Sequence, residues 1–173
     1  MSRSYAVECV CSHRGVHFQL SFARAGLELL SDYEDAAFEA TRNGIVMLGE
    51  TELSLDPPIE TLRKAYGDQL RVSAPLVRYR TTQGVEQPIM GLRVVCDPRH
   101  LDIVQRDLLM RSATVLEARV QDKEGVLSAN GPLPNLLGLR AQIQRLTDNK
   151  GQLAMWLSHY EKVDVEPPGG DAA

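Results

Sequence analysis

The segment that decides the fold of this chain runs from Gln87 to Val163. It opens with Gln87-Pro88-Ile89-Met90, which leads into the apolar run Leu92-Arg93-Val94-Val95-Cys96. It closes with Leu157-Ser158-His159-Tyr160-Glu161-Lys162-Val163. The two ends have the apolar content of strands, so the question is which elements lie between them.

Helix and turn signals alternate within this segment. Asp97-Pro98 predicts a helix start, because Asp caps helices and Pro suits the first helical turn. Strands are expected at residues 113–121 and 126–129, joined by a polar turn at residues 122–125. Pro134 predicts a second helix, which continues to Leu146. The resulting order of strand, helix, strand, strand, helix, strand predicts a ferredoxin-like split β-α-β sandwich.

The first half of the chain begins with two alternating segments, residues 5–13 and 16–22, around Arg14-Gly15. This pattern predicts an N-terminal β-hairpin, in which Cys9 and Cys11 share the apolar face. A short helix is expected from Ala23 to about Leu30. The hairpin would be an addition to the rest of the first half rather than part of its sheet.

Asn43-Gly44 predicts a second hairpin, because it stands between two apolar runs and both residues tolerate positive φ. A helix is expected to start at Asp56-Pro57-Pro58 and end at Gly67, followed by an extended segment interrupted at Pro75. The first half is thus a decorated variant of the second. The predicted class is α+β, with two ferredoxin-like sandwiches in tandem over residues 1–83 and 84–166 and a flexible tail at 167–173.

Composition restricts the possible partners. Apolar residues make up 43% of the chain and charged residues 24%, and the net charge is −4. A mildly acidic chain is poorly suited to non-specific nucleic-acid binding, although local basic patches remain possible. No apolar run reaches membrane-spanning length and the start lacks a signal-peptide core, so no membrane is expected. Three cysteines at no framework spacing indicate a reducing, cytoplasmic environment.

Residues 87–163 resemble the fifth, C-terminal domain of elongation factor G, most closely at Pro88-Ile89-Met90, at residues 138–146 and at His159-Tyr160-Glu161. A weaker resemblance to the third domain of that family covers residues 39–81, with its clearest motif at Pro75-Leu76-Val77-Arg78-Tyr79-Arg80. Residues 1–35 match this family poorly. The resemblance implies a translation-factor-like module that docks on the ribosome or a translation factor.

The departures from the family pattern limit that implication. Arg80 is followed almost at once by Pro88, so the family's fourth domain has no room between the two halves. The 173 residues contain no Gly-x-x-x-x-Gly-Lys-Ser/Thr loop, so no GTPase activity is expected. No nucleophile–base arrangement, metal motif or cofactor loop rises above chance, so no other enzyme activity and no cofactor are expected. Met110-Arg111-Ser112-Ala113 stands where the family has consecutive arginines and a glycine. This loss leaves open an alternative, a protein-interaction or assembly protein that kept the fold and left translation, with a homodimer possible because ferredoxin-like sheets have free edges.

Candidate chemistry in the sequence is sparse. Cys9, Cys11 and His13 alternate and are weak candidate zinc ligands, but structural zinc sites need four convergent ligands and free cysteine also acts as a small buried hydrophobe. Trp156 and Tyr160 are expected to share a strand face, with core packing favoured over a stacking platform for bases. The candidate rRNA or partner surface consists of basic residues in the second half: Arg106, Arg111, Arg119, Arg140, Arg145 and Lys150.

Overall fold

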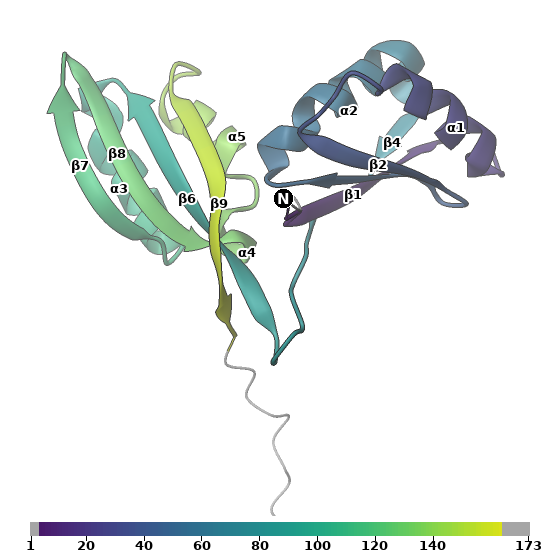
Figure 1. Cartoon of the computed structure of the whole chain (residues 1–173). Coiled ribbons are helices and arrows are strands. Elements are labelled where there is room, and N and C mark those ends of the chain that lie inside the picture. Colours follow the sequence, from purple (N-terminus) through teal and green to yellow (C-terminus); the bar gives the residue numbers. More distant parts are fainter. Residues whose placement is uncertain (1–3, 164–173) are drawn as a thin grey trace, which may run out of the picture.

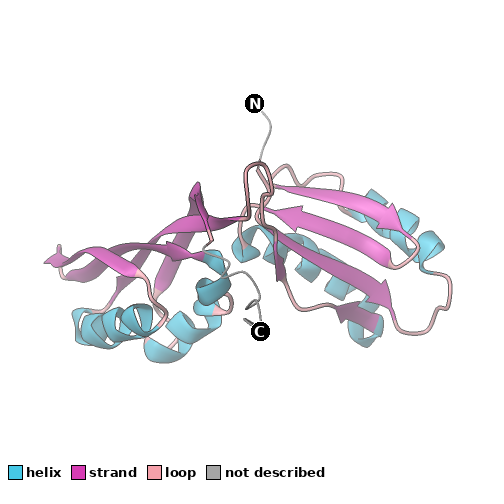
Figure 2. Cartoon of the chain, turned by 90° about the horizontal axis from the view of Figure 1, so that it is seen from below, coloured by secondary structure: helices cyan, strands magenta, loops and turns pink. Residues whose placement is uncertain are grey.

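A computed structural model describes residues 4–163 and shows two α+β sandwiches connected by residues 78–85 (Figure 1). In each, a β-sheet carries its helices on one face (Figure 2). The prediction of two ferredoxin-like sandwiches is therefore confirmed. The predicted tail, residues 167–173, lies outside the described residues.

The first sheet contains β1 (Val7–His13), β2 (Ala36–Thr41), β3 (Gly44–Gly49), β4 (Leu70–Val72) and β5 (Leu76–Val77). Its order is β2-β3-β1-β4, and β5 also pairs with β1. The helices α1 (Gln19–Leu29) and α2 (Glu52–Tyr66) pack on it, followed by the short 3-10 helix η1 (Gly67–Gln69). The extended segment is interrupted around Pro75, as predicted.

The second sheet contains β6 (Glu86–Cys96), β7 (Thr114–Gln121), β8 (Glu124–Pro132) and β9 (Gln152–Lys162), in the order β7-β8-β6-β9. The helical layer consists of η2 (Pro98–His100), α3 (Leu101–Met110), α4 (Leu133–Leu136) and α5 (Leu139–Leu146). The two sheets thus have the same strand order, which is the order of a split β-α-β unit. The first half repeats the second in topology although no sequence motif links them.

The predicted N-terminal hairpin is wrong. β1 is an inner strand that pairs with β3 on one side and with β4 and β5 on the other. The segment expected to return as a strand contains the start of α1, whose buried residues include Phe22, Ala23 and Gly26. Gln19 closes the connection, because its side chain accepts a hydrogen bond from His13 N–H (2.8 Å) and donates one to the His13 carbonyl (2.9 Å). Residues 7–29 therefore complete the first sandwich.

Two predicted helices also differ from the structure. α2 begins before Pro57-Pro58, at Glu52, because Thr51 Oγ1 caps it by accepting from Leu53 N–H (3.1 Å). Burial of Leu55, Pro58 and Leu62 along one helix face compensates for the two missing proline amides. The helix expected from Pro134 to Leu146 is split at Gly138, whose φ of 77° is left-handed. The hairpin at Asn43-Gly44 is confirmed.

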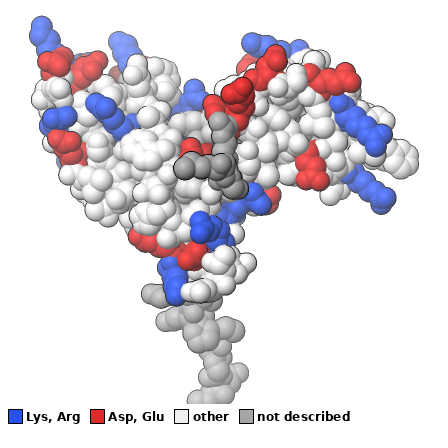
Figure 3. All heavy atoms as spheres, viewed as in Figure 1, with Lys and Arg blue, Asp and Glu red and all other residues white. Residues whose placement is uncertain are grey.

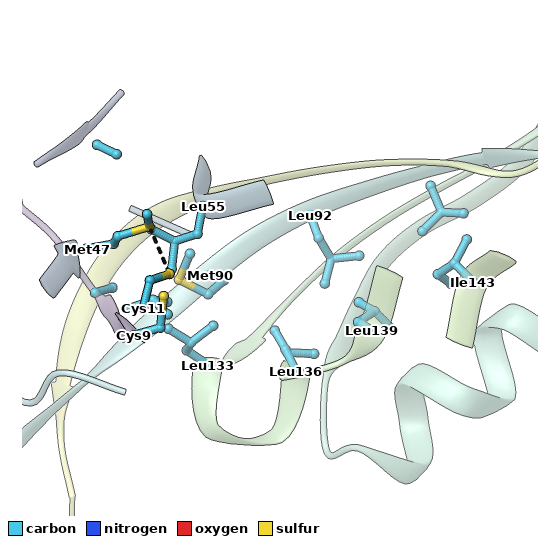
Figure 4. Packing of buried hydrophobic residues seen from close by; sticks show 14 of the residues in the cluster. Cys9, Cys11, Met47, Leu55, Met90, Leu92, Leu133, Leu136, Leu139 and Ile143 are labelled. Carbon is cyan, nitrogen blue, oxygen red and sulfur yellow. Dashed lines mark hydrogen bonds between the residues drawn. The ribbon is translucent and has the colours of Figure 1, made fainter. Parts of the chain in front are cut away.

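The two sandwiches contact each other through their helices. Glu52, in the first turn of α2, accepts a hydrogen bond from Gly138 N–H (2.9 Å), immediately before α5. One turn further along α2, Asp56 forms an ion pair with Arg140. The buried hydrophobic residues form one cluster that includes side chains of both sandwiches, among them Leu55, Met90 and Leu133 (Figure 4).

Candidate interaction surfaces

The predicted basic residues do not form one free surface. Arg111 is tied into the protein, because its guanidinium bonds Asp107 Oδ2 (2.8 Å) and the carbonyls of Asn135 (3.1 Å) and Leu137 (3.3 Å). It fastens the end of α3 to the α4–α5 connection. Its i,i+4 spacing from Asp107 was a signal for this pairing that the sequence analysis missed.

The other five basic residues are divided between different regions. Arg119 pairs with Glu117 on β7 (3.1 Å), and Arg140 pairs with Asp56 of the first sandwich. The remaining three are exposed in or beside the helical layer: Arg106, Arg145 and Lys150. Figure 3 shows the same dispersal, with charged side chains of the second sandwich mainly around its margin and few over the middle of the face in view.

The open face of the second sheet carries the single tryptophan of the chain. Trp156 lies opposite Gly91 in the β6–β9 pairing, and its side chain is 45% exposed. A Cβ on Gly91 would stand 2.3 Å from the indole nitrogen, so the ring lies directly on the glycine backbone. The absence of a side chain at position 91 thus lets a large apolar ring lie flat on the sheet with its outer side in solvent. The preference for core packing of Trp156 was wrong.

Trp156 and Tyr160 do not share a face, contrary to the prediction. The register shifts between Ile89 and Met90, so that one additional residue of β9 is accommodated there. Trp156 pairs with Gly91 and Tyr160 with Pro88, three positions apart on β6, and a β-strand alternates faces at every residue. Tyr160 instead stacks beneath Arg80 of the connecting segment, with the guanidinium carbon 4.3 Å from the ring centre.

The cysteines and His13 do not come together as a metal site of the predicted kind. Cys9 and Cys11 are 2% and 0% exposed on the helix-covered face of β1. His13 instead packs edge-on against Phe22 (5.7 Å) and Tyr66 (5.8 Å), and its Nδ1 accepts from Gly15 N–H. Within residues 4–163, no group of three or more His, Cys, Asp or Glu side chains is arranged to hold a metal.

The thiols differ in acidity. The hydrogen bond with Cys11 lowers the pKa of Cys9, and the same hydrogen bond together with burial raises the pKa of Cys11. Burial also raises the pKa of Cys96, which ends β6 in the second sandwich. A raised pKa disfavours the thiolate, so Cys96 is not arranged as a nucleophile.

One hydrogen-bonded chain near the end of β9 has the residue types of a hydrolytic triad. Ser158 Oγ lies 2.9 Å from His159 Nδ1, and His159 Nε2 lies 2.9 Å from Glu161 Oε1. The side chains of His159 and Glu161 are 48% and 57% exposed, so water competes for both contacts. The arrangement gives the serine no shielded base, and we assign it no catalytic role.

These features define a class of protein, an α+β protein with two ferredoxin-like sandwiches in tandem, which contact each other through their helices. Residues 85–169 match the family described as Elongation factor G C-terminus. Through these residues, the chain is similar to the C-terminal part of elongation factor G. In the part of the sequence that the structure describes, no helix is long and apolar enough to cross a membrane.

Two relatives illustrate how far the similarity extends. The mitochondrial ribosome-releasing factor 2 of Danio rerio is 29% identical over 82 residues, which are 47% of this chain and 11% of that protein. A crystal structure from Thermus thermophilus superimposes with a TM-score of 0.68 at 15% identity, over 95% of this chain and 42% of that one. The second likeness extends over both sandwiches and concerns the fold alone.

Proposed function

We propose that this chain is a non-catalytic docking module of the translation machinery that binds the ribosome or a translation factor in the cytoplasm. The observation that carries this proposal is the family match over residues 85–169, within a two-sandwich architecture that resembles the third and fifth domains of elongation factor G. The sequence provides no phosphate-binding loop. The proposed role is therefore binding and positioning, without GTP hydrolysis.

The open face around Trp156 is the favoured docking surface for a protein of the translation machinery. It combines an exposed indole with one nearby cation, Arg93 on β6, and the mutually paired Glu117 and Arg119 on β7. Of the six basic candidates, three are engaged in ion pairs or internal hydrogen bonds. Interface cores are enriched in tryptophan. Contact with rRNA would instead depend on the three exposed basic residues Arg106, Arg145 and Lys150.

Cosedimentation with purified ribosomes tests this function. The chain should pellet with ribosomes at low salt, and the salt dependence separates the two surfaces. Binding through Trp156 should persist as salt rises and should be lost in Trp156→Ala. Binding through rRNA should weaken steeply with salt and be lost when the three exposed basic residues are replaced by glutamate. A folded protein that does not pellet even at low salt would refute the ribosomal proposal.

A second candidate function is a protein-binding role outside translation, with a second copy of the chain as one possible partner. The exposed indole of Trp156 favours it, because tryptophan is enriched at protein–protein interfaces. The net charge of −4 also disfavours broad RNA contact. Affinity purification that returns one non-ribosomal partner, bound by the parent and not by Trp156→Ala, would favour this function.

A further inference from the structure

Three sulfur side chains meet on the buried face of the first sheet. Cys9 and Met47 are directly opposite each other in the β1–β3 pairing, and Cys11 follows two residues along on the same face of β1. The Cys11 thiol donates to Met47 Sδ at 3.9 Å. Figure 4 shows the sulfur atoms of these three residues next to one another. All three are at most 2% exposed.

The spacing of these sulfurs suits a trigonal metal ion. Sulfur ligands bind at about 2.3 Å, so two of them around one trigonal ion are separated by about 4 Å. The Cys11–Met47 separation of 3.9 Å agrees with this value. Cys9 is paired with Met47 across the two strands, so its side chain lies beside Met47 on the same face of the sheet.

The chemistry of the ligands selects the ion. Thiolate and thioether sulfur are soft donors, and a set without nitrogen or oxygen favours Cu(I) over zinc. We propose that Cys9, Cys11 and Met47 form a Cu(I)-binding site. Binding releases the two thiol protons to solvent and leaves Cu(I) held by two thiolates and one thioether, with no change of oxidation state.

The surroundings of the site support metal entry and charge balance. Cys9 lines a cavity of about 140 Å³, whose walls also include Leu55 and Ile59, the carboxylates Glu52 and Asp56, and Val72, Ser73 and Pro75. The cavity offers a path to the sulfurs past the edge of the first sheet. The hydrogen bond with Cys9 and burial raise the pKa of Cys11, and the positive charge of Arg63 on α2 opposes this rise only in part. The loaded site carries one net negative charge, which this arginine offsets in part.

Anaerobic titration of the purified chain with Cu(I), in competition with a coloured Cu(I) chelator, tests the proposal. One ion per chain should be retained, and Cys9→Ser and Cys11→Ser should each weaken retention at least tenfold. Met47→Leu keeps the core volume and removes the thioether, and it should also weaken retention at least tenfold. Cys96→Ser is the matched control, because it removes a buried thiol from the other sandwich and should leave binding unchanged.

Two results would overturn the proposal. If Cys96→Ser weakens binding as much as Cys9→Ser, the ion binds thiols without a defined site. If His13→Ala weakens binding and Met47→Leu does not, the ligands are those suggested by the sequence and not the sulfur cluster. X-ray absorption of the Cu(I)-loaded parent does not depend on the folding of any variant. It should show three sulfur neighbours, and nitrogen or oxygen neighbours would refute the site.

Discussion

Replacing Trp156 with alanine should weaken binding of this chain to ribosomes or to a translation factor. A tryptophan side chain presents about 250 Å², and this one is 45% exposed. About 110 Å² is therefore free for a partner to cover, which at about 25 cal/mol per Å² amounts to about 2.8 kcal/mol. After the cost of ordering interface side chains, the dissociation constant should rise about 10- to 100-fold.

The assay for this prediction is quantitative cosedimentation of Trp156→Ala beside the parent over a range of ribosome concentrations. Tyr79→Ala is the matched control, because Tyr79 is an aromatic residue of similar exposure, 48%, in the segment that connects the sandwiches. Circular dichroism and urea unfolding establish that each variant is folded. If a folded Trp156→Ala binds within about twofold of the parent while the parent binds well, the Trp156 face is not the docking surface.

The remaining predictions concern stability and are read by urea unfolding. Thr147→Val should lower the free energy of unfolding by about 1–3 kcal/mol, because the buried hydroxyl donates to the Ile143 carbonyl and accepts from Gly151 N–H. Thr147→Ser keeps the hydroxyl and should retain most of this stability. An unchanged unfolding midpoint in Thr147→Val would contradict this role. Burial raises the pKa of Glu52, so its contribution to stability is greatest at low pH and declines as pH rises through the folded-state value. The free energy of unfolding of Glu52→Gln should therefore rise relative to that of the parent between pH 4 and 7. A constant difference in unfolding free energy across this range would argue against the raised pKa. In a double-mutant cycle, Asp56 and Arg140 should couple by less than about 1 kcal/mol, since both side chains are about half exposed; a larger value would mean that the contact between the sandwiches is stronger than this ion pair suggests.

Local signals in the sequence predicted the second sandwich almost completely. Asp97-Pro98 marked the start of the helical segment, and Asp97 does cap it by accepting from Arg99 N–H (2.9 Å). The turn near Asp122 and Lys123 was also predicted, and both residues have positive φ. These features depend on residues close together in the chain, which is why a sequence pattern reveals them.

The errors occurred where distant residues decide the outcome. Residues 16–22 alternate as a strand would, but β3 and β4 occupy both edges of β1 and leave no place for a hairpin partner. The helix is broken at Gly138, where its N–H donates a hydrogen bond to Glu52 of the other sandwich. A local sequence pattern cannot predict this contact, because the two residues are distant in the chain. The domain division at residues 83 and 84 remains a prediction.

The sequence by itself determined the fold class of this protein and its resemblance to the elongation factor G family. Strand and helix periodicity over residues 87–163 and the short motifs at its two ends were sufficient, because both are properties of consecutive residues. Only the tertiary structure decided which side chains meet. Strand register brought Met47 to Cys9 and left His13 among aromatic rings. One irregularity in β9 separated Tyr160 from Trp156, because a shift of one residue moves every later side chain to the other face of a sheet.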